Sequence, residues 1–325
     1  MNKVYNKNGT RIREAFDKDA SWLASAFNNY TDEYPFMMVF QDASSGTDSG
    51  YDLTSGRGNT YVLRTMVDLL SDGNLQSLCY DYDNNKYYRF DASTTVIIYD
   101  SSLVKEGTIT MPSSAGHNND ACFHNGLVYL PGGNFFDATV EEGTKIYIWN
   151  PTTNTVTTIQ VQGIVQPANG STRIIAGACE KSRTENKLYL VCQDCTSNEL
   201  VHLPDDKLSV YELDLGTNTA TLMAEYPWEC VYLQGATFYD GIIYVACNTQ
   251  TTGSAGNYKG VTIKVIRTDI WSLIDELICE GVFEPEGMDV VPADGGYEIE
   301  VGLGHYGTIS LALRFTAPYA TIKDN

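Results

Sequence analysis

Short stretches in which apolar and polar residues alternate, separated by Gly, Asn and Asp, recur along most of this chain. The clearest stretch is 233–247, in which two β-prone segments flank Asp240 and Gly241. An Asp-Gly pair supplies the positive φ angles that a tight hairpin turn needs. The stretch therefore predicts two antiparallel strands. Four further stretches align with it, at 75–90, 119–130, 176–191 and 286–301.

Each of these five units continues with more β-prone sequence. A third segment recurs at 95–99, 145–149, 208–213, 261–266 and 309–315. A fourth follows in the first four units at 107–111, 155–159, 220–224 and 270–278, and the last of these would also suit a short helix. Four antiparallel strands per unit, repeated at intervals of about 44 to 58 residues, indicate a β-propeller.

The fifth unit ends after its third strand, although a propeller must close without exposing a raw sheet edge. We therefore expect an N-terminal strand to complete the last blade, with 60–69 as the first candidate and 36–40 as the second. The Gly- and Ser-rich sequence 43–59 is typical of a loop. The prediction is an all-β, five-bladed propeller over 34–325.

Residues 1–33 have a different pattern, because their apolar residues recur at multiples of roughly one helical turn. These residues are Ile12, Phe16, Leu23, Phe27 and Tyr30. The spacing predicts an amphipathic helix over 11–29. Such a short helix needs a partner surface, so it could pack on the propeller or serve in oligomerisation.

The charge and the apolar content narrow the possible partners. The formal net charge is −20, from 41 acidic and 21 basic residues, which argues against nucleic acid and anionic membranes. No apolar run approaches the roughly 20 residues that span a bilayer, and the N-terminus lacks the apolar region of a signal peptide. We expect a soluble chain that is not exported through the Sec pathway.

The eight cysteines of a chain without a signal peptide are expected to be reduced. Cys192 and Cys195 form a lone CxxC, for which ordinary strand and loop cysteines are a better interpretation than zinc or redox chemistry. In the repeat, one column holds Cys79, Cys122, Cys179, Thr237 and Asp289. Small side chains in that column indicate close packing between blades.

The first strand of each propeller blade lines the central channel, and loops on such a scaffold carry most sites. Polar residues open this strand in four of the units, and aromatic residues and histidines are predicted near them. The candidate ligand-binding residues at the channel mouth are Gln76, His117, Asn119, Asp120, Phe135, Phe136, Trp228, Gln234, Glu286, His305 and Tyr306. Amides and carboxylates beside aromatic faces suit a sugar. Alternatively, the amides could bond the backbone of a neighbouring blade, and Trp228 could fill the seam between blades three and four.

Hydrolysis is the competing use of this mouth, since glycosidases place two carboxyl groups across the scissile bond. Asp120, Glu286 and Asp289 are acidic, but nothing in their spacing forms a catalytic signature. Enzymatic activity is therefore the less favoured interpretation, and no catalytic residue is assigned. We expect no cofactor, with calcium at the channel mouth, held by Asp120, Glu286 or His117, as an alternative.

The repeat at 233–245, the opening of the last unit at 284–289 and the helical N-terminal segment resemble the five-bladed propeller of bacteriophage receptor-binding and other tail proteins. The resemblance implies a virion protein, often a homotrimer, that contacts a cell-wall glycopolymer or supports a domain that does. This chain lacks a long N-terminal stem and a tower-like insertion, and no catalytic residue carries over.

The resulting expectation is a non-catalytic phage tail or virion structural protein that binds a bacterial surface polysaccharide. It would be made in the host cytoplasm, reside in the virion and contact other virion proteins, without binding nucleic acid or inserting into membranes. The alternatives are a glycoside hydrolase or lyase, and a pure assembly scaffold, because fold alone does not choose between them.

Overall fold

The structure is a computed structural model of the 325-residue chain. It describes residues 48–56, 60–68, 75–91, 94–112, 118–132, 139–196, 203, 205–228, 230, 232–249, 260–280, 284–293, 296–305 and 309–316. The helix predicted over 11–29, the candidate strand 36–40 and the domain boundary at residue 33 lie outside these ranges and remain predictions.

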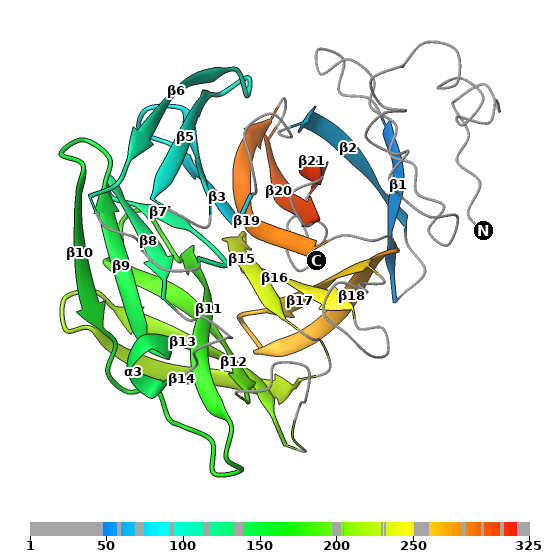
Figure 1. The fold of residues 1–325 in the computed structure, drawn as a ribbon. Helices are drawn as coiled ribbons and strands as arrows, with labels where there is room; N and C mark the ends of the chain where they lie inside the picture. The colour runs from blue at the N-terminus through cyan, green and yellow to red at the C-terminus, as the bar shows by residue number, and fades with distance from the viewer. Residues whose placement is uncertain are drawn as a thin grey trace.

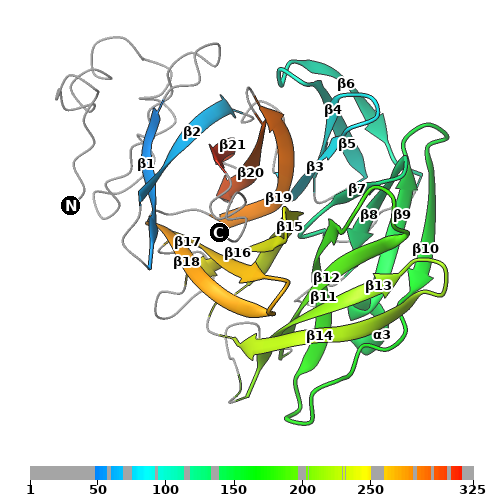
Figure 2. The same ribbon diagram turned by 180° about the vertical axis from the view of Figure 1, so that it is seen from behind.

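Five blades, each of four antiparallel strands, surround a central axis, and their first strands gather around it (Figures 1 and 2). Blade 1 contains β3 (Ser77–Asp81), β4 (Lys86–Phe90), β5 (Thr95–Asp100) and β6 (Lys105–Thr110). Blade 2 contains β7 (Cys122–His124), β8 (Leu127–Pro131), β9 (Lys145–Asn150) and β10 (Thr155–Gln160), with the one-turn helix α3 (Val140–Gly143) before β9. Blade 3 contains β11 (Thr172–Glu180), β12 (Lys187–Cys195), β13 (Lys207–Asp214) and β14 (Thr219–Pro227).

Blade 4 contains β15 (Leu233–Tyr239), β16 (Ile242–Thr249), β17 (Gly260–Arg267) and β18 (Ser272–Glu280). Blade 5 contains β19 (Glu284–Ala293), β20 (Gly296–His305), β21 (Ile309–Thr316) and β2 (Thr60–Asp68). The five-bladed propeller expected from the repeat is thereby confirmed. The segment that suited either a strand or a helix is the strand β18.

The N-terminal strand β2 closes the ring, as the incomplete fifth unit predicted. It pairs antiparallel with β21, with Arg64 opposite Arg314 and Asp68 opposite Leu311. In Figure 1 the two strands lie side by side, although they lie far apart in the sequence. Blade 5 therefore draws its outer strand from the beginning of the described chain.

The loop predicted over 43–59 is wrong in part, because β1 (Asp48–Ser55) is a strand. It pairs with β2 and also, at Thr54 and Ser55, with β18 of blade 4. Ser55 Oγ donates a hydrogen bond to Asp275 Oδ2 on β18. Blades 4 and 5 thus share one nine-stranded sheet. Pairing on both sides imposes the extended conformation on a sequence with little β propensity of its own.

The turn at the end of β15 has the conformation that the Asp-Gly pair predicts. Asp240 and Gly241 have φ angles of 48° and 81°, and Tyr239 pairs with Ile242 across them. Asn125 and Gly126 repeat this geometry in blade 2, with φ angles of 49° and 76°. Positive φ at both central residues defines the hairpin turn whose twist matches that of the strands.

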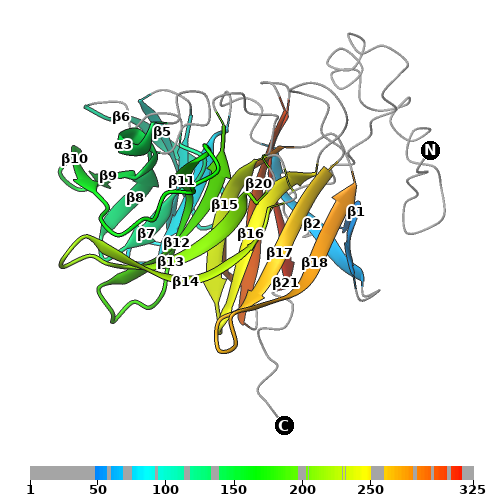
Figure 3. The same cartoon turned by 90° about the horizontal axis from the view of Figure 1, so that it is seen from below.

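Apolar side chains on the faces of the sheets pack between neighbouring blades, whose strands stand along the axis in the side view (Figure 3). The buried cluster between blades 3 and 4, for example, includes Val191, Leu208 and Val210 from one blade and Leu233 and Val245 from the other. No helix in the described part of the chain is long and apolar enough to cross a bilayer.

Candidate functional site: the central channel

The inner strands approach one another backbone to backbone at one level of the channel. A Cβ added to Gly235 of blade 4 would lie 2.9 Å from the Met288 backbone N of blade 5. A Cβ added to Gly287 would lie 2.7 Å from the Leu78 backbone N of blade 1. Contacts this close require glycine. In the repeat, Ser77, Asp120, Gly177, Gly235 and Gly287 occupy equivalent positions, so four of the five positions have a very small residue.

Asp120 is the exception, and its carboxylate lies at the centre of the ring. Its Oδ2 accepts hydrogen bonds from the backbone N–H groups of Ala178 in blade 3 and Ala236 in blade 4, both with N···O distances of 3.0 Å. Its Oδ1 accepts one from the N–H group of Met288 in blade 5, at 3.4 Å. One side chain of blade 2 therefore bonds the inner strands of three other blades.

The Asp120 side chain is fully buried. Burial raises the pKa of its carboxyl group well above the usual range, while the N–H groups of Ala178, Ala236 and Ala121 oppose the shift. Both oxygens are occupied by backbone donors, so this carboxyl group is part of the framework of the ring. Its environment suits structural bonding better than contact with a ligand.

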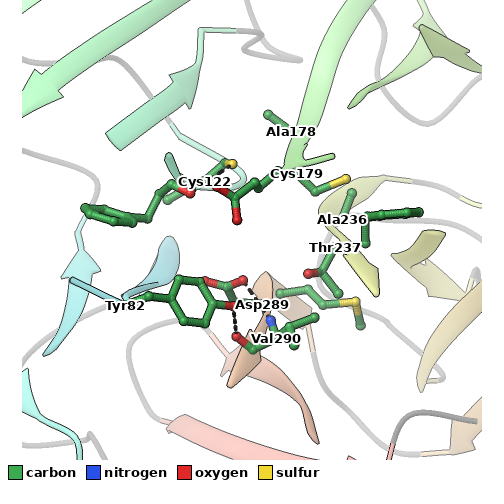
Figure 4. Close-up of a pocket in the computed structure, with 13 residues that line it drawn as sticks. Tyr82, Cys122, Ala178, Cys179, Ala236, Thr237, Asp289 and Val290 are labelled. Atoms are coloured by element: carbon green, nitrogen blue, oxygen red, sulfur yellow. Dashed lines mark hydrogen bonds between the residues drawn. The ribbon is translucent and has the colours of Figure 1, made fainter. Parts of the chain in front are cut away.

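On one side of Asp120, four of the five residues of the predicted small-residue column line a cavity (Figure 4). Cys122, Cys179, Thr237 and Asp289 surround it, together with Tyr82. Its volume is about 30 Å³, which is room for little more than water. The column was predicted to pack closely between blades. Its cysteines and Thr237 are buried and Asp289 is half-buried, yet they leave this small polar void.

Asp289 at this cavity is also engaged by the backbone. Its Oδ2 accepts a hydrogen bond from Tyr80 N of blade 1, at 2.6 Å, and its Oδ1 accepts one from Val290 N, at 2.7 Å. Burial raises the pKa of Asp289 to about 8, and the charges of Glu300 and Glu180 act in the same direction, against the two N–H groups.

Next to Asp289, blade 5 contains a buried ion pair that the sequence analysis missed. Arg314 Nε donates to Glu300 Oε2 at 2.6 Å, and an Arg314 guanidinium N–H donates to the Tyr87 hydroxyl of blade 1. The repeat does contain a pattern that could have revealed this ion pair. The residues paired with the column are Tyr88, Tyr129, Tyr189 and Tyr244 in blades 1 to 4 and Glu300 in blade 5. A charged residue in that place marks the seam between blades 5 and 1.

The predicted channel mouth lies on the other side of the ring, where the inner strands begin. Gln76, Asn119, Gln234 and Glu286 are all at least 91% buried. Gln234 Nε2 donates to Glu284 Oε1, and the Glu286 carboxyl group lies 3.3 Å from where a Cβ on Gly304 would be. Burial raises the pKa of Glu286 well above its usual range, and the charge of Glu284 adds to the shift.

Several polar atoms at this mouth are buried without a hydrogen-bond partner among the described residues. They are Gln76 Oε1, Glu286 Oε2 and both polar atoms of the Asn118 side chain. Buried polar groups are nearly always paired, so each such atom needs an explanation. Asn118 and Glu284 were not among the predicted site residues, although each lies within two positions of one.

The remaining predicted residues are placed as follows. Trp228 is 6% exposed in the apolar cluster between blades 3 and 4, so the seam interpretation accounts for its position. His305 ends β20, and only its backbone is described. His117, Phe135, Phe136 and Tyr306 lie outside the described residues. Among the predicted site residues whose side chains the structure describes, the amides and the carboxyl groups therefore lie around the channel, and Trp228 lies in the seam.

Two predictions about metal and cysteine chemistry concern residues that the structure describes. Within the described ranges, no three His, Cys, Asp or Glu side chains are arranged to hold a metal ion. Cys192 and Cys195 lie three residues apart on β12 and belong to different apolar clusters. Side chains at that spacing on a strand point to opposite faces, so the two thiols do not form a site together.

No protein-family model matches this chain, and no curated protein matches it. Among solved structures, the propeller of Dos1 is similar over 71% of this chain and 53% of its own, with 9% identity and a TM-score of 0.38. The chain thus spans about half of that structure. The WD40 domain of Neurospora crassa Pan2 is similar over 76% of this chain and 90% of its own, with 9% identity and a TM-score of 0.41. U3-55K is similar over 78% of this chain and 77% of its own, with 9% identity and a TM-score of 0.40. Such weak likenesses add no argument to the strand pairing, which itself defines a five-bladed β-propeller.

Proposed function

We propose that this chain is a non-catalytic binding propeller of a bacteriophage tail or virion, and that its channel mouth binds a bacterial surface glycan. The observation that carries the proposal is a set of buried polar atoms on Gln76, Asn118 and Glu286 that have no hydrogen-bond partner within the described part of the chain. Each unpaired buried group costs about 1–3 kcal/mol. The hydroxyl groups of a sugar, which both donate and accept, would satisfy amide and carboxyl groups together.

The position of the acids favours binding over chemistry. Asp120 and Asp289, two of the three acids considered for hydrolysis, accept hydrogen bonds from backbone N–H groups. The phage origin rests on the resemblance of the repeat at 233–245 and of 284–289, and the polysaccharide as ligand rests on the same resemblance together with the mouth.

Retention on immobilised bacterial envelope polysaccharide tests the proposal. The wild-type chain should be retained, and Gln76→Ala and Glu286→Gln should lower retention at least tenfold. Gln162→Ala is the matched control, because Gln162 is an exposed amide far along the chain from the mouth residues. Unaltered retention in both mouth variants would contradict the proposal. If the wild type does not bind any such polysaccharide, a scaffold role replaces it.

One observation favours a second candidate, a glycoside hydrolase. Glu286 and Glu284 lie two residues apart on β19, and the pKa of Glu286 is raised by burial and by Glu284, as a general acid requires. Release of reducing ends from the same polysaccharide, abolished by Glu286→Gln, would establish this activity. Binding without release would exclude it for that substrate.

A further inference from the structure

The thiols of Cys230 and Cys247 are in direct contact. Cys247 Sγ lies 2.7 Å from Cys230 Sγ and 3.4 Å from the carbonyl oxygen of Thr262. Cys230 belongs to the segment that leads from β14 of blade 3 into β15 of blade 4, whereas Cys247 lies on β16. Both belong to the apolar cluster between blades 3 and 4. The contact therefore joins an interblade connection to the second strand of the next blade.

The other cysteines are placed differently, although all eight are buried thiols. Cys122 Sγ donates to the Phe123 carbonyl at 3.8 Å, and Cys195 Sγ donates to the Thr172 carbonyl at 3.5 Å. The Cys192 and Cys195 thiols of the CxxC belong to different clusters. The Cys230–Cys247 contact, by contrast, is a hydrogen bond between the sulfur atoms of two cysteines.

We propose that Cys230 and Cys247 are the site of an intrachain disulfide, formed with a small-molecule disulfide such as oxidised glutathione as the oxidant. The thiolate of Cys230 attacks one sulfur of the oxidant, which gives a mixed disulfide and releases one glutathione thiolate. Cys247 then loses its proton and attacks Cys230 Sγ, and the second glutathione leaves. The two protein thiols are oxidised, the oxidant becomes two thiols, and the two protons end on these thiols or in water.

The order of the two steps follows from exposure. Cys230 is 5% exposed and Cys247 is 0% exposed, so the reagent reaches Cys230 first. Burial raises the pKa of the Cys247 thiol, the hydrogen bond to Cys230 adds to this, and the nearby ammonium group of Lys264 opposes it. Lys264 is itself buried and paired with Glu276, at 2.5 Å. Cys247 thus suits the second, intramolecular step.

The bond would be absent in a reducing cytoplasm and stable in an oxidising environment. It would close a loop between positions 17 apart in sequence, and cross-links stabilise by restricting the unfolded chain. We expect oxidation to raise the melting temperature by roughly 4–8 °C. This inference uses no residue of the channel mouth and holds whether or not a glycan binds there.

Peptide mapping after equilibration with oxidised glutathione tests the site directly. Asp240 is the one aspartate between the two cysteines, so a protease that cleaves before Asp separates them into peptides 214–239 and 240–268. Each peptide contains a single cysteine. The oxidised chain should give the two peptides joined, with two hydrogen atoms lost, and a reductant should separate them.

Cys230→Ser and Cys247→Ser should each abolish the joined peptides and the gain in melting temperature. Cys122→Ser is the matched control and should keep both, because Cys122 lines the central cavity instead. Refolding from urea in the same glutathione buffer removes any limit on access of the oxidant. Absence of the joined peptides after refolding, or a disulfide that maps to other cysteines, overturns the proposal.

Discussion

Asp120 shows how one side chain can hold a closed ring of strands together. The backbone N–H groups that point into the channel have no neighbouring strand to bond, and an unpaired buried N–H group is costly. Asp120 accepts three of them, from Ala178, Ala236 and Met288. Sequence reasoning took this acid as a candidate ligand-binding residue. Its structural role was visible only in the small residues at the equivalent positions of the other units.

Replacement of Asp120 by alanine should destabilise the fold strongly. Three buried N–H groups would lose their acceptor, at about 1–3 kcal/mol each, so we expect the free energy of unfolding to fall by at least roughly 3 kcal/mol. Urea denaturation measures it. Asp83→Ala, which removes an exposed carboxylate from the β3–β4 turn, should change stability little. Equal midpoints for the two variants would show that Asp120 does not hold the ring.

Asp289 should make stability depend on pH. Its pKa is about 8 in the folded chain, mainly because of burial, against an ordinary value of 3.8. Between these values the folded state binds the proton more tightly, so this contribution to stability is present at low pH and is lost as pH rises through about 8. Melting temperatures from pH 5 to pH 9 should therefore fall more for the wild type than for Asp289→Asn. Parallel curves would contradict the shifted pKa.

At the scale of single strands, the alternating pattern predicted most elements, because each strand has one face in an interblade core. It failed for β1. Residues 48–55 contain two Asp, two Ser and a Gly, and their strand exists through pairing with β2 and β18. The pairing with β18 joins Thr54 and Ser55 to residues more than two hundred positions away, at Ile278 and Leu277, and a local sequence pattern cannot predict such a contact.

The hairpin turn of blade 4 should be sensitive to a single Cβ. Gly241 has a φ angle of 81°, and an added Cβ would meet only Thr268 Oγ1 at 4.0 Å, so Gly241→Ala adds backbone strain without a clash. We expect a loss of about 1 kcal/mol in urea denaturation. Gly107 on β6 has open space around an added Cβ and no positive φ. Gly107→Ala is therefore the control and should be neutral. If the two variants lose the same stability, the turn geometry is not the cause.

At the scale of the whole molecule, closure of the ring is the feature that the repeat predicted most usefully. A unit with three strands required a fourth, and β2 supplies it. The repeat could not predict what the closed ring places at its centre. The bonds from Asp120 to three blades and the buried polar atoms at the mouth depend on side chains that meet only after closure.

Closure by β2 predicts a sharp difference between two truncations. A chain that begins at residue 70 lacks β1 and β2, so β21 would have an unpaired edge and blade 5 would be incomplete. It should lose its cooperative thermal transition. A chain that begins at residue 34 keeps both strands and should melt within a few degrees of the full chain. If the chain that begins at residue 70 melts cooperatively at the temperature of the full chain, β2 is not needed to close the ring.

The central claim is that the channel mouth binds a glycan without cleaving it, and calorimetric titration with a size-fractionated envelope oligosaccharide tests it most directly. The account predicts one site per chain, at least tenfold weaker binding for Glu286→Gln and Gln76→Ala, unaltered binding for Gln162→Ala, and no new reducing ends after the titration. Equal affinity for the wild type and both mouth variants would contradict it.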